Sequence, residues 1–222
     1  DDYYHEAERV HGEGAARLIA ESFRAAVDHV ERIVQEEGIA CDFVRLDGWW
    51  FPGDDEGPAL LRKEHDAARR AGLDDVTLGD DWPITTFSPG AVLRFPNQAQ
   101  FHILKYVAGL ARAAERHGAR IHSGAHVVEV EDGAPCTVRT DAGRVVTAAA
   151  VVVATNTPVN DRVAMHTKQA PYRTYVIGAR VPRGAVPRGM YWDTCEPYHY
   201  VRLLHAFPEG HDESGGTDVL IV

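Results

Sequence analysis

The region that decides the fold is residues 95–156, which read FPNQAQFHILKYVAGLARAAERHGARIHSGAHVVEVEDGAPCTVRTDAGRVVTAAAVVVATN. Apolar residues recur at helical spacing over 98–117, and Gly118 follows, which predicts a helix that ends there. Strand patterns over 91–95 and 119–122 flank this helix. The three elements together predict a strand, helix, strand crossover of an α/β sheet.

The second half of the region predicts more strands. Runs at 126–130, 136–140 and 144–147 are short and closely spaced, which is typical of an antiparallel meander. The run AAAVVVA at 148–154 lacks polar alternation, so we expect a parallel strand that is buried on both faces.

Helices and turns are predicted on the N-terminal side. Residues 3–37 have the pattern of one long amphipathic helix, and 57–72 that of a second helix with Pro58 near its start. Between them, Asp47-Gly48 separates two short apolar runs, which predicts a tight hairpin carrying Trp49 and Trp50. A loop rich in Pro and Gly follows from residue 80.

The C-terminal part predicts only strands. They span 172–181, 190–192, 198–204 and 217–222, with turns rich in Pro and Gly between them. We expect one antiparallel sheet, shared with the Trp49-Trp50 segment. The fold class is therefore α/β of a mixed α+β kind, with an outer domain interrupted by an inner one.

Composition is that of a globular protein, with 222 residues, 45% apolar and 25% charged, which excludes collagen-like, coiled-coil and disordered chains. The net charge of −10 argues against nucleic acid and membrane partners, because both present negative phosphates. Cys41, Cys136 and Cys195 lack metal-ligand spacing and indicate unpaired thiols in a cytoplasmic protein.

Both ends of the sequence are unusual. It begins with DDYY rather than Met and stops within the strand-like run DVLIV at 218–222. A native domain rarely ends inside a strand. We therefore expect a segment of a longer protein.

Motifs for other chemistry are incomplete. GEGAAR at 12–17 has two glycines of a dinucleotide fingerprint, but a helical pattern precedes it where a strand is required. No GxSxG nucleophile motif occurs. The closest histidine groups are His117, His122 and His126, and His199 and His205. Neither group has the spacing of a known metal site, so no metal is predicted.

The order of elements in residues 95–156 resembles the middle of FAD-dependent oxidoreductases of the D-amino-acid oxidase and glycine oxidase type. The matches are Pro96 before the helix, GARI at 118–121, VVEV at 127–130, the meander, and VVVATN at 151–156. Asn156 stands where the family commonly has Gly. Two hallmarks are missing: the N-terminal strand-GxGxxG-helix unit and the C-terminal glycine-rich segment.

The resemblance continues beyond this region. PYRTY at 171–175 is similar to the segment that opens the family's substrate sheet, and YHYVR at 198–202 resembles its tyrosine-bearing strand. The implied fold has part of a Rossmann-like FAD-binding domain at 96–160. An antiparallel-sheet substrate domain would form from 1–95 and 161–222.

The resemblance implies an enzyme that oxidises an amine or amino acid by hydride transfer to FAD. This chain is then expected to be an incomplete fragment, inactive alone and a poor binder of FAD. The residues that the resemblance places at the substrate are Tyr200, Tyr191, Arg202, Arg173, Trp49 and Trp50. Those that it places at FAD are Val127, Val128, Ala154, Thr155 and Asn156. Each of these also has a structural interpretation, as one face of a strand or as hairpin core.

Some relatives with this middle region carry a C-terminal Rieske iron–sulfur domain, so such a domain is a possible partner elsewhere in the parent chain. A different class of function stays open. The aromatic residues could form a partner surface on a non-catalytic α/β module. A nicotinamide-dependent enzyme is a third interpretation, which the all-β C-terminal part argues against.

Overall fold

The structure is a computed structural model that describes residues 3–155, 170, 172–205 and 216–222. The chain forms two compact units, one of Asp1–Ala113 with Val176–Val222 and one of Ala114–Tyr175. The larger unit thus combines two separated stretches of sequence. The mixed α/β class is confirmed, and the domain boundaries after residues 95 and 160 stay a prediction.

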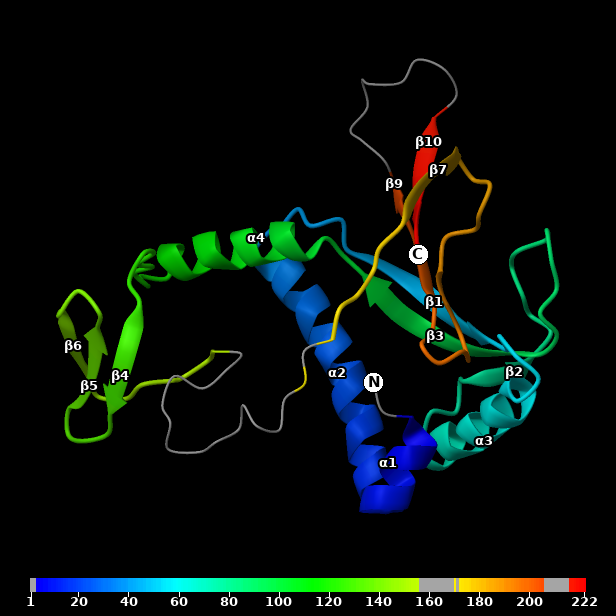
Figure 1. The fold of residues 1–222 in the computed structure, drawn as a ribbon, viewed down its shortest axis with the longest axis horizontal. Helices are drawn as coiled ribbons and strands as arrows, with labels where there is room; N and C mark the ends of the chain where they lie inside the picture. Colours follow the sequence, from blue (N-terminus) through cyan, green and yellow to red (C-terminus); the bar gives the residue numbers. More distant parts are fainter. Residues whose placement is uncertain (1–2, 156–169, 171, 206–215) are drawn as a thin grey trace. The chain divides into compact units, whose positions relative to one another are not determined.

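One seven-stranded sheet organises the larger unit (Figure 1). In spatial order its strands are β2 (Thr77–Gly79), β3 (Val92–Gln100), β1 (Val44–Phe51), β8 (Met190–Asp193), β9 (Tyr200–His205), β10 (Thr217–Ile221) and β7 (Gly178–Pro182). Strands β1 and β8 run parallel, and the other neighbouring pairs are antiparallel. The predicted sharing of the C-terminal strands with the Trp49-Trp50 segment is confirmed.

Two helices, α1 (Tyr4–His11) and α2 (Glu13–Glu36), replace the single helix predicted over residues 3–37. The prediction was wrong at Gly12, whose φ of 83° is left-handed and cannot continue an α-helix. The break lets α1 pack against both α2 and α3 (Gly57–Arg70). In Figure 1, α1 lies beside the lower end of α2, and α3 lies next to α1.

The predicted hairpin at Asp47-Gly48 is also wrong, because β1 runs through it without a turn. Asp47 accepts hydrogen bonds from the Arg94 guanidinium on β3 at 2.6 and 2.8 Å. The β1–β3 register shifts between Leu46 and Gly48, which marks a bulge. A Cβ at Gly48 would lie 2.8 Å from the ring of Trp192. Gly48 therefore leaves room for the ring of Trp192. It is not part of a turn.

The predicted crossover around the 98–117 helix does not form. Strand β3 continues to Gln100, α4 (Ile103–Arg116) follows, and residues 119–122 form no strand. Strand β3 pairs antiparallel with both neighbours. Pro96 is the reason why the sequence predicted a shorter strand here. The proline is tolerated because β2 pairs only with residues 92–94, so the edge of β3 that faces β2 is unpaired beyond Arg94.

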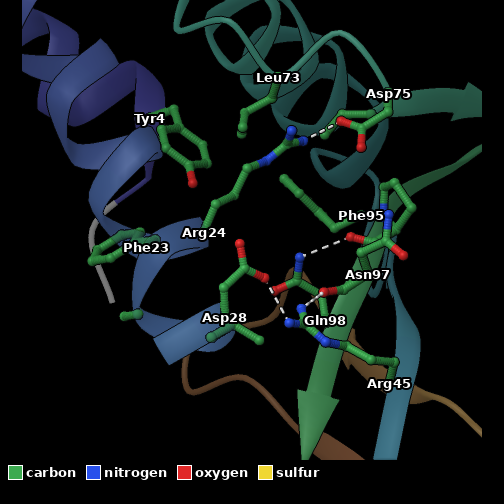
Figure 2. A pocket seen from close by; sticks show the side chains of 14 residues that line it. Tyr4, Phe23, Arg24, Asp28, Arg45, Leu73, Asp75, Phe95, Asn97 and Gln98 are labelled. Atoms are coloured by element: carbon green, nitrogen blue, oxygen red, sulfur yellow. Dashed lines mark hydrogen bonds and ion pairs between the residues drawn. The ribbon is translucent and has the colours of Figure 1, made fainter. Parts of the chain in front are cut away.

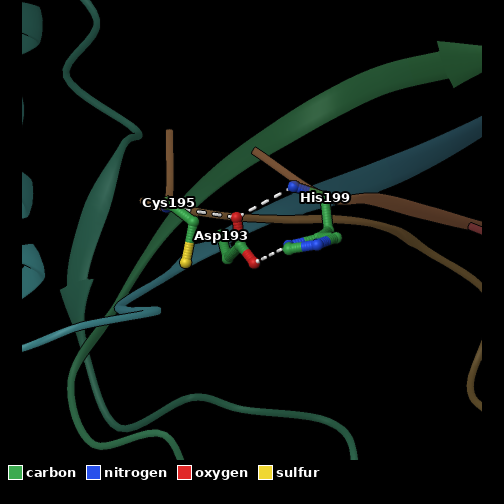
Figure 3. Close-up of side chains that lie close together, drawn as sticks. All are labelled: Asp193, Cys195 and His199. Atoms are coloured by element: carbon green, nitrogen blue, oxygen red, sulfur yellow. Dashed lines mark hydrogen bonds and ion pairs between the residues drawn. The ribbon is translucent and has the colours of Figure 1, made fainter. Parts of the chain in front are cut away.

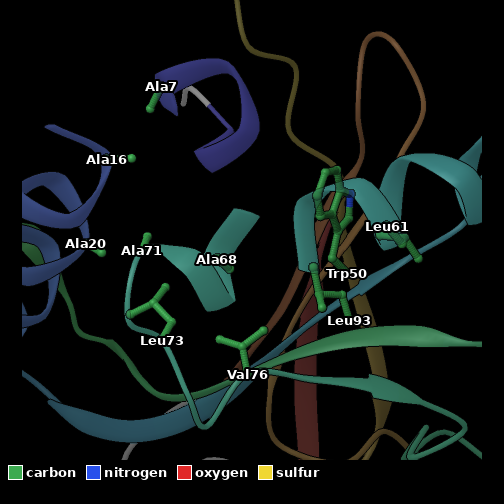
Figure 4. Close-up of a cluster of buried hydrophobic side chains, with 10 residues drawn as sticks. All are labelled: Ala7, Ala16, Ala20, Trp50, Leu61, Ala68, Ala71, Leu73, Val76 and Leu93. Atoms are coloured by element: carbon green, nitrogen blue, oxygen red, sulfur yellow. The ribbon is translucent and has the colours of Figure 1, made fainter. Parts of the chain in front are cut away.

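A cluster of buried side chains joins the sheet to α1, α2 and α3 (Figure 4). Trp50, Leu61 and Leu93 are at most 2% exposed. The helices contribute small residues, which allow close approach: Ala7, Ala16, Ala20, Ala68 and Ala71. Burying each of the larger side chains stabilises the fold by about 1.5–3 kcal/mol. This cluster fixes Trp50, a predicted site residue, in place.

The smaller unit contains the predicted meander, which is confirmed as β4 (Val127–Glu131), β5 (Cys136–Thr140) and β6 (Val145–Ala148), all antiparallel. The buried parallel strand predicted over 148–154 is wrong, because residues 149–155 form no strand and Val152 is 87% exposed. A buried strand needs neighbours for its backbone N–H and C=O groups. Within the described part of the chain, no strand pairs with this segment.

Candidate substrate pocket and cofactor edge

Side chains alternate between the two faces of the large sheet, and this alternation sorts the predicted site residues. Trp50 pairs with Trp192 across β1–β8, and Trp192 pairs with Tyr200 across β8–β9. Trp49 pairs with Tyr191. Directly paired residues share a face. Trp50, Trp192 and Tyr200 therefore define one face, called here the pocket face, and Trp49 and Tyr191 define the packed face.

A cavity of about 350 Å³ lies on the pocket face, within the size range of small-molecule sites. It is lined by Tyr3, Tyr4, Trp50, Glu64, Phe95, Gln98, Met190, Trp192, Asp193, Tyr198 and Tyr200. Most of these side chains are aromatic, and they come from both stretches of the larger unit. The cavity therefore offers ring faces for stacking and tyrosine hydroxyls for hydrogen bonds.

Tyr200 is the predicted substrate residue best placed on this wall, with 38% of its surface exposed. Burial raises the pKa of Tyr200, the neighbouring Arg202 lowers it, and Tyr198 raises it, with a net upward shift. The phenol therefore stays protonated at neutral pH and can donate a hydrogen bond to a bound molecule.

Trp50 has a fixed orientation in the wall. Its indole N–H donates to the carbonyl oxygen of Asp193 at 2.8 Å, and its ring stacks on Tyr3 with centroids 5.0 Å apart. Burial also raises the pKa of Tyr3. Two elements far apart in sequence thus hold the tryptophan, as a preformed pocket requires.

Glu64 lies 3% exposed on α3 and was missed by the sequence analysis. Its carboxylate accepts the backbone N–H groups of Tyr4 at 2.7 Å and His5 at 3.1 Å, and it contacts the Nδ1 atom of His5 at 2.6 Å. These are N–H groups in the first turn of α1, which no helical carbonyl can satisfy. One sequence signal could have revealed Glu64: it falls on the apolar stripe of α3, between Leu61 and Ala67.

Two predicted substrate residues lie on the packed face and do not line the cavity. The Tyr191 hydroxyl donates to the carbonyl oxygen of Pro187 at 2.8 Å, and the Trp49 indole N–H donates to that of Asp81 at 3.0 Å. The two rings stack with centroids 5.3 Å apart. This geometry supports packing at both positions, and substrate contact there stays a prediction.

The two predicted arginines differ in placement. Arg202 follows Tyr200 by two residues on β9, so it lies on the pocket face beside the cavity. Arg173 is an exposed residue of the smaller unit. The structure therefore associates Arg202 with Tyr200, while the part of Arg173 in substrate binding stays a prediction.

A second cavity, of about 640 Å³, lies between α2 and strands β1 and β3 (Figure 2). Its charged side chains pair with one another: Arg45 contacts Asp28 at 2.6 Å, and Arg24 pairs with Asp75. Arg45 also donates to the carbonyl oxygen of Asn97 at 2.9 Å. Arg45 thus joins α2 to β1, and Arg24 joins α2 to the segment between α3 and β2. No motif in the sequence indicated these pairs.

Asp193, Cys195 and His199 lie together where β8 ends (Figure 3), with one donor atom of each within 4.8 Å of the others. Such donors could hold a metal ion. However, both carboxylate oxygens of Asp193 already accept hydrogen bonds, and burial and Asp193 raise the pKa of the Cys195 thiol away from the thiolate that a metal binds. We interpret the group as a hydrogen-bonded loop. The sequence analysis grouped His199 with His205 and missed Asp193.

The residues predicted to contact FAD lie in the smaller unit. Val127 is half-buried and Val128 is 46% exposed at the start of β4, where the β4–β5 register shifts. Ala154 and Thr155 are exposed outside any strand, and Asn156 lies outside the described residues. The described positions offer apolar surface and backbone groups, which suit the edge of a nucleotide site. FAD contact at these positions stays a prediction.

The resemblance to flavin oxidoreductases implied a discontinuous antiparallel sheet and a meander. The structure has both, except that β1 and β8 run parallel, so the large sheet is mixed. The sequence matches the DAO family, described as FAD dependent oxidoreductase, over residues 3–217. The chain belongs to this family, and the family binds FAD.

A protein of Bacillus subtilis (strain 168), YhfW, is 27% identical over 198 residues, which cover 89% of this chain and 38% of that protein. Its name describes a Rieske 2Fe-2S iron-sulfur protein.

Solved structures share the fold at low identity. L-proline dehydrogenase from P. horikoshii has a TM-score of 0.62 at 16% identity over 94% of this chain and 55% of its own. Glycine oxidase from Bacillus cereus ATCC 14579 has a TM-score of 0.63 at 15% identity, covering 90% and 55%. For L-amino acid deaminase from Proteus vulgaris the TM-score is 0.60 at 16% identity, covering 91% and 47%. The chain spans about half the length of these structures and a smaller share of the length of YhfW.

Proposed function

We propose that this chain forms the substrate-binding part of an enzyme that oxidises an amine or amino acid with FAD as electron acceptor. The observation that carries the proposal is the aromatic cavity on the pocket face, which brings Tyr200 and Trp50 together. Family membership supports the redox class. The names of the structural neighbours, which include an amino acid deaminase and a glycine oxidase, support an amine or amino acid as substrate.

The chain's own residues would bind and orient the substrate. The protonated Tyr200 hydroxyl would donate a hydrogen bond to it, and Trp50 would form an apolar wall that excludes water. Arg202, beside the cavity, would pair with a carboxylate if the substrate carries one. FAD, when bound, supplies the acceptor for the hydride.

The fit to FAD is partial. Val127, Val128, Ala154 and Thr155 would contribute the edge of the nucleotide site. Among the described residues, one connection with a glycine leads from a strand into a helix: residues 52–56, between β1 and α3. It carries Asp54, Asp55 and Glu56, whose negative charges would repel a pyrophosphate. Gly12, which belongs to the partial fingerprint at 12–17, follows α1 and not a strand. We therefore propose that residues outside this sequence hold the pyrophosphate.

The test is flavin reduction in the full-length parent protein that contains this chain, loaded with FAD. Under anaerobic conditions, a panel of amines and amino acids is added and the loss of oxidised-flavin absorbance is followed. We expect reduction by at least one amine or amino acid. In Tyr200→Phe, the concentration for half-maximal reduction should rise roughly three- to tenfold, since one hydrogen bond contributes about 0.5–1.5 kcal/mol.

Tyr106→Phe is the matched control, because Tyr106 packs in a separate cluster with Ile39 and Cys41. It should leave the concentration dependence unchanged. Bound flavin that no amine or amino acid reduces would contradict the proposal and favour a non-catalytic module with an aromatic partner surface.

Two wider proposals concern the cellular setting. The similarity to YhfW supports a Rieske domain as a partner elsewhere in the parent chain. The cysteine pattern supports a cytoplasmic location. In the described part of the chain, no helix combines the length and apolar character needed to cross a membrane.

A further inference from the structure

The connection from β8 to β9, residues 194–199, is folded around the side chain of Asp193. The carboxylate accepts the backbone N–H of Cys195 at 3.2 Å and that of His199 at 2.9 Å, and it contacts the ring Nδ1 of His199 at 2.7 Å (Figure 3). With the proton on Nδ1, all three groups donate to the carboxylate. A single side chain thus satisfies N–H groups at both ends of the loop.

Asp193 is 7% exposed, and burying a carboxylate is costly unless hydrogen bonds or a cation compensate it. His199 is an ion-pair partner of Asp193 when its ring is protonated. The loop hydrogen bonds are therefore what stabilises the buried carboxylate of Asp193, a residue that also borders the cavity. Conversely, the loop conformation depends on this carboxylate.

The backbone of Asp193 connects the loop to the pocket face. Its carbonyl oxygen accepts the indole N–H of Trp50 at 2.8 Å, and its N–H donates to the carbonyl oxygen of His199 at 3.2 Å. The loop also rests on the connection before α3, where the N–H of Gly53 donates to the Thr194 hydroxyl at 2.9 Å. A Cβ at Gly53 would lie 3.1 Å from the Cβ of Asp193.

We propose that Asp193 is a positioning residue of the pocket, whose carboxylate holds residues 194–199 so that Tyr198 and Tyr200 face the cavity. Tyr198 belongs to this loop, and Tyr200 begins β9 directly after it. The inference rests on the proposed function in one respect, that the cavity is the substrate site. Asp193 acts through the tyrosines and does not need to touch the substrate.

The test reads the tyrosines directly and needs no activity. The protein is labelled with 3-fluorotyrosine, and the ¹⁹F NMR signals of Tyr198 and Tyr200 are assigned with Y198F and Y200F. In Asp193→Ala we expect both signals to move toward the value of free fluorotyrosine. In Asp193→Asn they should stay close to wild type, because the amide oxygen still accepts the backbone N–H groups.

Asp218→Ala is the matched control. Asp218 is also a buried aspartate of the same sheet, 2% exposed, and its carboxylate accepts the N–H of Gly184 at 3.0 Å. It should lower stability without moving the two signals. Unmoved signals in Asp193→Ala, or an equal movement in Asp218→Ala, would overturn the proposal.

If Asp193→Ala does not fold, Asp193→Leu decides, since it keeps a similar shape and offers no acceptor to the N–H groups of Cys195 and His199. Shifted signals of Tyr198 and Tyr200 support the proposal, and unshifted ones overturn it.

A kinetic arm uses the FAD-loaded protein. Asp193→Ala should raise KM at least about tenfold and change kcat less, because the wall of the pocket is displaced while the reacting groups remain. A KM equal to that of wild type would overturn the proposal. If wild type shows no flavin reduction at all, the proposed function fails, while the NMR result still decides the role of Asp193.

Discussion

The two faces of the large sheet carry similar aromatic residues in adjacent positions, yet they differ in whether those residues border the aromatic cavity. On the packed face, Tyr191 and Trp49 direct their polar atoms to backbone carbonyl oxygens and stack on each other. On the pocket face, Trp50 and Tyr200 line a cavity with Tyr198. The difference shows that a tyrosine or tryptophan becomes a candidate ligand only when its neighbours leave space beside it.

The comparison also shows that one residue can belong to the hydrophobic core and line the cavity as well. Trp50 is 2% exposed, so it is a core residue by burial, and it lines the cavity with the small part that remains. Trp49 is 8% exposed but lines no part of that cavity. The exposed fraction alone would favour Trp49 over Trp50 as a cavity residue. The strand register shows instead that Trp50 lies on the pocket face and Trp49 on the packed face.

The largest expected effect is the loss of either tryptophan. Trp50→Ala and Trp49→Ala should each lower the free energy of unfolding by about 3–5 kcal/mol, since each removes a large buried ring. Only Trp50→Ala should also abolish saturable substrate binding, because only Trp50 belongs to the pocket face. Urea unfolding gives the first quantity and substrate titration of the FAD-loaded protein the second.

Trp50→Phe separates the two effects, because it keeps a ring in the cavity wall and loses the hydrogen bond to Asp193. It should recover most of the binding. Equal loss of binding in Trp49→Ala and Trp50→Ala would contradict the division of the sheet into two faces.

The sequence predicted the strands that carry these residues but not their division between two faces, because it missed the register that decides it. The alternation of Tyr198, Tyr200 and Arg202 indicated a strand, and β9 forms from Tyr200 onward. Trp49-Trp50 was placed in a hairpin because Asp47-Gly48 is a strong turn signal, whereas the glycine was needed for the ring of Trp192. Which residue pairs with which across β1 and β8 depends on a contact between residues more than a hundred positions apart, and local patterns do not contain it.

The same reason explains the other errors. The run at 148–154 has the composition of a buried strand, but composition does not supply the neighbouring strands. Glu64 and Asp193 are single carboxylates whose partners are backbone N–H groups, and backbone partners leave no pattern in a sequence. Family resemblance led to Trp50 and Tyr200, which line the cavity, because a resemblance carries tertiary information that periodicity lacks; the contact of these residues with a substrate stays a prediction.

The next effect in size concerns the support of the pocket by α1. Glu64→Ala leaves the N–H groups of Tyr4 and His5 without their acceptor and should lower the free energy of unfolding by about 2–3 kcal/mol. Glu64→Gln keeps one acceptor oxygen, so it should lower the free energy of unfolding by about half as much. Urea unfolding followed by circular dichroism measures both.

Glu8→Ala is the control, because Glu8 also joins α1 to α3, through Arg70 at 3.0 Å on the surface. An exposed ion pair contributes less than about 1 kcal/mol. If Glu8→Ala were as destabilising as Glu64→Ala, burial would not be the reason for the importance of Glu64.

The smallest effect tests the packed face through pH. Burial raises the pKa of Tyr191 from 10.0 to about 12, so the unfolded chain loses this proton first as pH rises. The stability that the neutral phenol contributes is present below pH 10 and is lost between about pH 10 and 12. Two pKa units correspond to about 2.7 kcal/mol.

Tyr191→Phe lacks this titration but also lacks the hydrogen bond to Pro187, which contributes about 1 kcal/mol at neutral pH. The free energy of unfolding of the variant should therefore be lower than that of wild type at pH 7. The two free energies should become equal at about pH 11, where half of the stability that comes from the raised pKa has been lost. Urea unfolding of both proteins from pH 7 to 11 measures the convergence. If the difference between them stayed constant with pH, the Tyr191 hydroxyl would be in contact with water, and Tyr191 would belong with Tyr200 on a ligand-accessible surface.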